Sequence, residues 1–125
     1  MIAQLGQVML YVDDQQAAKN FWVEKLGFHL LSEVQLDADM VAIEVAPTKN
    51  SQTSLVLHDR AVVREINSDM NLETPSLMFY AEDLNKLYEE FQIMGIATGE
   101  MVELPQGRVF NFRDEEGNYF AVAQQ

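Results

Sequence analysis

The chain has 125 residues, of which 48% are hydrophobic and 10% aromatic, enough to bury the core of one domain. Its formal charge of −12 opposes binding to nucleic acid or to an anionic membrane, and it either favours a cationic ligand or only keeps the surface soluble. The chain has no cysteine, which excludes disulfides and thiolate chemistry. It also has no apolar run long enough to span a membrane. Residues Met1 to Gln4 show no signal-peptide pattern, so we expect a cytoplasmic location.

The first predicted element is a strand. Residues Leu5 to Val12 alternate with period two, which places Gln7, Met9 and Tyr11 on one face and the apolar Val8, Leu10 and Val12 on the other.

A helix is predicted next, from Asp14 to Leu26. Asp13 followed by Gln16 has the pattern of a capping box, and Gly27 suits a left-handed residue after the helix. One apolar stripe follows at helical spacing, formed by Ala17, Ala18, Phe21, Trp22 and Leu26.

Three strands and a less regular stretch complete the first half. The strands are expected at Phe28–Leu36, Met40–Val45 and Thr53–His58. Residues Arg60 to Thr74 are long for a connector, with a short helix expected at Arg60–Ile66, and they indicate a linker or a flap over a pocket.

The same order then repeats in the second half of the chain. Ser76–Ala81 matches Gln7–Val12 in residue type, Asp83 is the expected cap of a second helix, and Gly95 closes that helix. The remaining strands are expected at Ala97–Leu104, Gly107–Arg113 and Tyr119–Ala123.

This order predicts an α+β fold of two βαβββ modules forming a curved mixed sheet with helices on the outer face. We expect a single domain of residues 1–125, with modules at about 1–60 and 74–125 and a linker at 61–73. Side chains on the helix-free side would line a trough. The pattern leaves open whether Phe110 and Phe112, or Val109 and Asn111, face it.

Four stretches carry a resemblance to a known family: Val8–Asp14, Ala18–Phe28, Phe79–Leu84 and Phe112–Phe120. With the internal repeat, the chain resembles over essentially its whole length the vicinal oxygen chelate superfamily. That superfamily includes glyoxalase I, bleomycin-resistance proteins, fosfomycin-resistance enzymes and extradiol dioxygenases. The resemblance implies the glyoxalase/bleomycin-resistance fold.

The resemblance also implies where a metal would bind in the family's metalloenzymes. Those positions are taken here by Gln7, Val56, Ser76 and Ala121. Val56 and Ala121 have no donor atom, and Gln7 and Ser76 offer only neutral oxygens, whereas a divalent metal needs at least three imidazole or carboxylate donors. We therefore expect no metal and no cofactor.

The metal-free branch of the resemblance is the bleomycin-resistance type. We expect a homodimer that binds and sequesters an amphipathic, cationic or aromatic small molecule, with no nucleic-acid or membrane partner. The expected ligand-binding residues are Gln7, Met9, Tyr11, His58, Ser76, Met78, Tyr80 and Tyr119.

His58 leaves a second function open. It shares the parity of Ser54 and Val56, so it either faces the trough as a general base or is a solvated residue at a strand end. The alternative function is therefore a glyoxalase-related lyase or isomerase with His58 as its catalytic residue. A structural or regulatory protein without a small ligand also stays open, as does swapping of modules between subunits.

Overall fold

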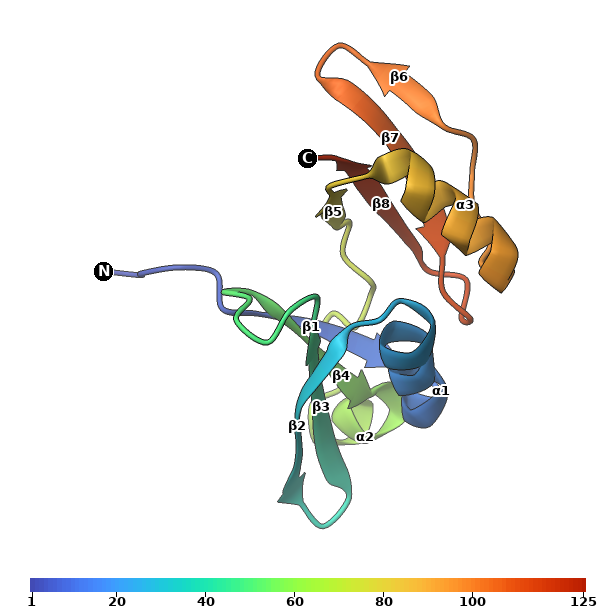
Figure 1. Ribbon diagram of the computed structural model, residues 1–125. Helices are drawn as coiled ribbons and strands as arrows, with labels where there is room; N and C mark the ends of the chain where they lie inside the picture. The colour runs from blue at the N-terminus through green and yellow to red at the C-terminus, as the bar shows by residue number, and fades with distance from the viewer. The chain divides into compact units, whose positions relative to one another are not determined.

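The strands form two four-stranded sheets, each with its own helix. The structure, a computed structural model, describes residues 1–125 and divides them into two units, Met1–Thr74 and Pro75–Gln125 (Figure 1). None of the helices is both long enough and apolar enough to cross a membrane.

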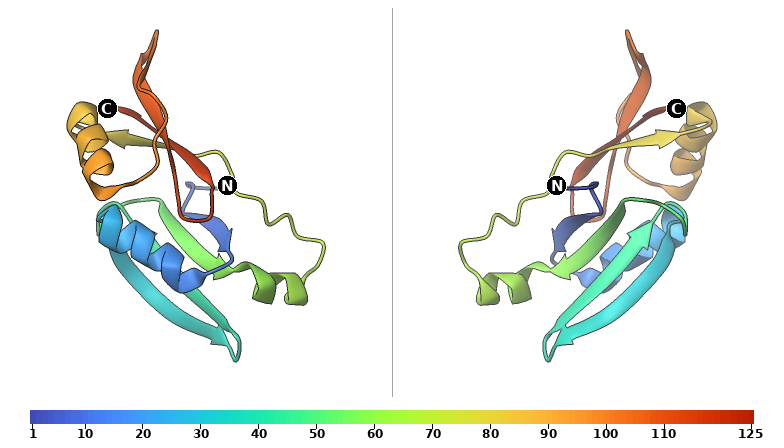
Figure 2. Two further views of the ribbon diagram at one scale, coloured as in Figure 1. Left: turned by 90° about the vertical axis from the view of Figure 1, so that its right-hand side faces the viewer. Right: turned by 90° about the vertical axis from the view of Figure 1, so that its left-hand side faces the viewer.

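In the first unit the strand order is β1-β4-β3-β2. β1 pairs with β4 in parallel, and the other neighbours are antiparallel. Figure 2 shows α1 on one face of this sheet, while the opposite view looks onto the other face. The elements are β1 (Gln7–Val12), α1 (Gln15–Asn20), a π-helical segment η1 (Phe21–Lys25), β2 (His29–Asp37), β3 (Met40–Ala46), β4 (Ser54–Asp59) and α2 (Arg60–Ile66).

The cap of α1 differs from the prediction. Asp14, not Asp13, is the N-cap, and its carboxylate accepts from the backbone N–H of Ala17 at 3.0 Å. The Asp13 carboxylate instead pairs with the guanidinium of Arg60, a residue far along the chain. The capping-box pattern was therefore wrong by one residue, because a tertiary ion pair holds Asp13.

The predicted helix Asp14–Leu26 is found as α1 followed directly by η1. The widened turn is closed by the bond from the N–H of Leu26 to the carbonyl of Phe21, 3.1 Å long. Adjacent aromatic residues Phe21 and Trp22 are both buried in this turn. Gly27 follows at φ 74°, the left-handed conformation predicted for it.

The core of the first unit lies between the sheet and α1–η1. The Gln15 side chain donates to the backbone carbonyls of Val41 and Leu57, which fixes the start of the helix against β3 and β4. The buried side chains here are Leu10, Val12, Ala18, Phe21, Trp22, Ile43, Val45, Leu55 and Leu57.

The second unit repeats this plan with strand order β5-β8-β7-β6. The helix α3 has Asp83 as its N-cap, which accepts from the N–H of Lys86 at 3.1 Å, and it ends at Gly95 with φ 72°; both were predicted. The elements are β5 (Met78–Ala81), α3 (Leu84–Met94), β6 (Val102–Leu104), β7 (Gly107–Arg113) and β8 (Tyr119–Gln124).

Two strands of this unit are shorter than predicted. β5 begins at Met78 rather than Ser76, because Leu77 is the first residue that bonds to β8, through its carbonyl and the N–H of Ala121. β6 covers only the last part of 97–104; before it, Thr98 forms an isolated bridge to Phe112. Gly99 weakens the strand at that point.

An aromatic cluster answers the question that the pattern left open. The Phe110 ring lies 4.9 Å from that of Tyr88, and the Phe112 ring 5.3 Å from that of Phe91, both on α3. Phe110 and Phe112 are therefore core residues. Their neighbours Val109, Asn111 and Arg113 have the opposite parity.

The α+β class and the two βαβββ modules are confirmed. The hydrogen bonds join the strands into two sheets rather than one. The short helix predicted at Arg60–Ile66 is present as α2, and it occupies part of the stretch 61–73 that was expected to be a linker.

Trp22 provides a test of the core. Its side chain is 1% exposed and its ring centre lies 5.1 Å from that of Phe28. We predict that Trp22→Ala lowers the free energy of unfolding by about 3–5 kcal/mol, because it leaves a cavity under the sheet. Urea denaturation followed by circular dichroism measures this. Ile93→Ala, at a side chain that is 86% exposed, is the control and should change stability by less than about 0.5 kcal/mol. Equal effects of the two changes would contradict the packing described.

Candidate functional site

The helix-free face of the first sheet is built by the pairing of β1, β4 and β3. Gln7 lies opposite Ser54, and Tyr11 opposite His58, in the parallel pair. Glu44 of β3 lies opposite Val56. Because side chains alternate along a strand, all residues of this parity share one face. We define the helix-free face as Gln7, Met9, Tyr11, Ser32, Ala42, Glu44, Ser54, Val56 and His58.

Glu44 is the only acidic residue among these nine, and three neutral donors hold its carboxylate. Oε2 accepts from the hydroxyl of Ser54 at 2.6 Å and from Nε2 of Gln7 at 3.1 Å. Oε1 accepts from the hydroxyl of Ser32 at 3.2 Å. The donors come from β4, β1 and β2, so the Glu44 side chain joins all four strands.

The charge of Glu44 is stabilised without being neutralised. The hydrogen bonds from Ser54 and Gln7 lower the pKa of this carboxyl below its ordinary 4.5; partial burial opposes them and the bond from Ser32 adds to them. None of these partners is cationic. A carboxylate has about four acceptor positions, so one is left for a further donor. The face therefore presents an ionised, half-buried anion.

His58 lies at the end of the same face. It is 8% exposed; its Nε2 lies 3.3 Å from Sδ of Met9, and its ring stacks on that of Tyr11 with centres 5.7 Å apart. The other ring nitrogen, Nδ1, is buried and has no hydrogen-bond partner. Burial lowers the pKa of the imidazole below its ordinary 6.5, so His58 is neutral at neutral pH.

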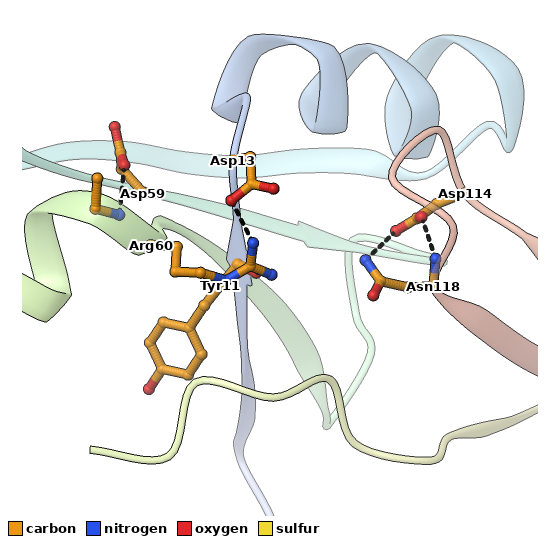
Figure 3. Close-up of polar contacts among 7 residues, drawn as sticks. Tyr11, Asp13, Asp59, Arg60, Asp114 and Asn118 are labelled. Carbon is orange, nitrogen blue, oxygen red and sulfur yellow. Dashed lines mark hydrogen bonds and ion pairs between the residues drawn. The ribbon is translucent and has the colours of Figure 1, made fainter. Parts of the chain in front are cut away.

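The backbone around Tyr11 and His58 is held in place from the next helix. Arg60, at the start of α2, donates to the carbonyl of Tyr11 at 2.6 Å and pairs with Asp13 (Figure 3). Asp59, the last residue of β4, caps α2 by accepting from the N–H of Ala61 at 3.0 Å. The ends of β1 and β4 are thus fixed together.

The second sheet also has a helix-free face, and it is more exposed. Met78 lies opposite Ala121 and Tyr80 opposite Ala123, while Tyr119 lies opposite Arg113. The side chains of Met78, Tyr80 and Tyr119 are 49%, 69% and 64% exposed. The Arg113 guanidinium carbon lies 6.0 Å from the centre of the Tyr119 ring, a cation–π contact.

A rigid turn places Tyr119. The buried Asp114 carboxylate accepts from both the backbone N–H and the side-chain amide of Asn118, at 2.8 and 3.0 Å (Figure 3). It also accepts from the backbone N–H of Glu116 at 3.0 Å. Gly117, at φ 84°, supplies the left-handed residue of the turn.

The structure brings together four of the predicted ligand-binding residues, Gln7, Met9, Tyr11 and His58, on one face of the first sheet. Three others, Met78, Tyr80 and Tyr119, share the helix-free face of the second sheet. Ser76 differs from the prediction: it is exposed and precedes β5, so it belongs to neither sheet.

Glu44 is not among the site residues predicted from the sequence, although the sequence pattern contains a signal for it. It is a single charged residue within the apolar run Met40–Ala46, where period-two alternation places Ile43 and Val45 in the core. The same alternation turns Glu44 to the helix-free face. Its partners Ser32 and Gln7 cannot be read from the pattern, because they depend on strand pairing.

The donor chemistry of this face does not fit a divalent metal. Of the four family positions, Val56 lies on the face beside Glu44 without a donor atom, Gln7 already donates to Glu44, and Ala121 is apolar. Nowhere in the chain do three His, Asp or Glu side chains gather in a way that could hold a metal ion.

The chain is thus a βαβββ repeat in which each sheet has a helix-free face, and comparison with known proteins identifies the family with this fold. The model of the Glyoxalase/Bleomycin resistance protein/Dioxygenase superfamily matches residues 4–122. The chain belongs to this superfamily, which confirms the resemblance and the fold predicted from the sequence.

Individual relatives span the whole chain. Protein YetH of Bacillus subtilis is 35% identical over 125 residues, covering 99% of this chain and 100% of YetH. TnmS3, an antibiotic binding protein from a Streptomyces species, is 31% identical with a TM-score of 0.82, covering 98% of this chain and 96% of TnmS3. A superfamily member from Sphaerobacter thermophilus has a TM-score of 0.85 at 24% identity, covering 99% of this chain and 98% of that one, and it shows the fold alone.

His58 gives this face a measurable pH signature. We predict that His58→Phe raises the free energy of unfolding by about 1 kcal/mol at about pH 7.5, because it removes a buried nitrogen that has no partner and keeps an aromatic ring beside Tyr11. The lowered pKa means that the unfolded chain takes up a proton first as the pH falls below 6.5. The free energy of unfolding of the wild-type protein therefore decreases as the pH falls from 6.5 to the lowered pKa. This decrease is absent in His58→Phe.

Urea denaturation at about pH 7.5 and about pH 5.5 checks this prediction, since both values lie above the range in which Glu44 titrates. His29→Phe is the matched control, because His29 is an exposed histidine on β2. A His58→Phe variant with the pH dependence of the wild-type protein would show that His58 is not the buried neutral group described.

Proposed function

We propose that this protein binds and sequesters an amphipathic small molecule, cationic or aromatic, without using a metal. The ligand lies on the helix-free face of the first sheet, where Met9 and Tyr11 provide apolar and aromatic contacts. The observation that carries the proposal is the ionised carboxylate of Glu44, which three neutral groups hold in place and no cationic side chain neutralises.

A cation is the ligand group that this carboxylate fits. Charge-assisted hydrogen bonds are roughly twice as strong as neutral ones, and Glu44 has an acceptor position to spare. The neighbouring Met9, Val56 and Tyr11 exclude water from one side and so strengthen the attraction. The formal charge of −12 also raises the local concentration of cations around the protein.

Two further observations support binding of a small organic molecule. TnmS3, with 31% identity over nearly the whole chain, is described as an antibiotic binding protein. The helix-free face of the second sheet, taken by itself, carries the exposed side chains of Met78, Tyr80 and Tyr119, and exposed aromatic and thioether side chains suit an aromatic ligand.

Glu44→Gln tests the proposal. The change keeps the size of the side chain, but it removes the charge and replaces one acceptor oxygen by an amide donor. We predict that it weakens binding of cationic aromatic compounds about tenfold or more and leaves neutral isosteres of those compounds unaffected. Thermal shift against a panel of cationic aromatic compounds and their neutral isosteres finds the ligands, and titration calorimetry with and without EDTA measures affinity, which EDTA should not change.

Glu89→Gln, at an exposed position on α3, is the matched control for the loss of one negative charge. If it weakens binding as much as Glu44→Gln does, long-range charge rather than a site at Glu44 attracts the ligand. If no cationic compound in the panel shifts the melting temperature, the binding function is wrong.

We also propose a cytoplasmic homodimer. The edge strands β2 and β6 carry exposed apolar side chains, Leu30, Val34 and Leu36 on the first and Val102 and Leu104 on the second, which favour self-association. Sedimentation should give a species of twice the chain mass of 14.2 kDa. A species of 14.2 kDa would contradict the dimer.

One observation favours a second function. The neutral His58 has an unpartnered ring nitrogen, as a general base requires, which would suit a metal-free lyase or isomerase. Mass spectrometry of the bound compound distinguishes the two functions, because a sequestering protein returns its ligand unchanged.

A further inference from the structure

We propose that the ligand carries a hydrogen-bond donor, such as a hydroxyl group, in addition to its cationic group, and that Nδ1 of His58 accepts from this donor while Glu44 binds the cation. This inference rests on the proposed function, and it adds the chemical class of the ligand: a hydroxylated amine with an apolar or aromatic body.

The first support is the unsatisfied nitrogen of His58. Buried polar groups are almost always hydrogen-bonded, so one without a partner calls for a physical explanation. The Asp59 cap and the bond from Arg60 to Tyr11 hold the strand ends on either side of the ring, so His58 is kept where it is by the backbone. A ligand that supplies the missing hydrogen-bond partner of Nδ1 explains why a buried imidazole occupies this position.

The second support is the direction of the missing bond. Nε2 of His58 lies 3.3 Å from Sδ of Met9, and a thioether sulfur can only accept. The tautomer that makes this contact a hydrogen bond has its proton on Nε2, and in that tautomer Nδ1 is a bare acceptor. The group that satisfies Nδ1 is thus a donor, such as a hydroxyl or an N–H.

The third support is the placement of the two polar groups. Glu44 lies opposite Val56, and His58 is two residues further along β4 on the same face, which makes Glu44 and His58 diagonal neighbours about 7–8 Å apart. A small molecule can span that distance. The Tyr11 ring, stacked on His58, offers an aromatic surface beside it.

Nδ1 is buried, so a ligand reaches it only when protein atoms move. Met9, whose sulfur lies 3.3 Å from the other ring nitrogen, Nε2, is 38% exposed and unbranched. Methionine changes rotamer readily, so a ligand can displace it at low cost.

Three probes with a common body separate the two contacts. Tyramine has an ammonium and a phenol, phenethylamine has only the ammonium, and tyrosol has the phenol with a neutral alcohol in place of the ammonium. Each is titrated into the wild-type protein, His58→Phe, Glu44→Gln and the double variant at about pH 7.5, where His58 is neutral. Two-dimensional NMR detects binding at millimolar probe concentrations.

We expect the wild-type protein to bind tyramine about tenfold more tightly than phenethylamine, and His58→Phe to bind the two equally. We expect Glu44→Gln to weaken both amines about tenfold and to leave tyrosol unchanged. His29→Phe should behave as the wild-type protein, because His29 is an exposed histidine on β2.

Two results overturn the inference and leave the proposed function standing. The first is equal binding of tyramine and phenethylamine by the wild-type protein. The second is a tyramine preference that persists in His58→Phe. In both cases Glu44→Gln must still weaken the binding of both amines. Loss of the Glu44 effect would instead overturn the proposed function. Absence of saturable binding of either amine to the wild-type protein overturns both.

Discussion

The parallel pairing of β1 with β4 is the constraint on which the rest of the first unit depends. It places Gln7 beside Ser54 and Tyr11 beside His58, residues that are far apart in the chain. The backbone bond from Ser54 to the carbonyl of Gly6, 3.0 Å long, begins this ladder. A shift by one residue would turn every polar side chain of β1 toward the helix and its apolar ones away from it. The register therefore determines both the core and the candidate site.

The polar chemistry of the helix-free face follows from that register. Gln7 and Ser54 both donate to Glu44 because the register of β1 and β4 places them opposite each other, and Ser32 donates to it from β2. The result is one carboxylate with a lowered pKa among neutral donors, where a metal site would need several charged or imidazole ligands. The helix-free face thus presents a single carboxylate, whereas a divalent metal needs several such donors.

Much of the fold was predictable because it depends on local physics. Gly27 and Gly95 were placed after helices because only a left-handed residue fits there, and both have positive φ. The boundary of β7 and the short helix α2 were also predicted correctly. The errors occur where a distant partner decides the outcome. Asp13 pairs with Arg60 instead of capping α1, and Ser76 lies before the first bond of β5.

The sequence by itself determined the βαβββ repeat and the set of residues that share each sheet face, because period-two and helical spacing are properties of the local backbone. It also placed Gln7, Met9 and Tyr11 on one face and left open whether His58 shares it, which the pairing of β1 with β4 decided. Only the tertiary structure decided that Phe110 and Phe112 pack under α3, that Glu44 is held by three donors, and that Nδ1 of His58 has no partner. These outcomes depend on contacts between strands far apart in the chain, which no local pattern specifies.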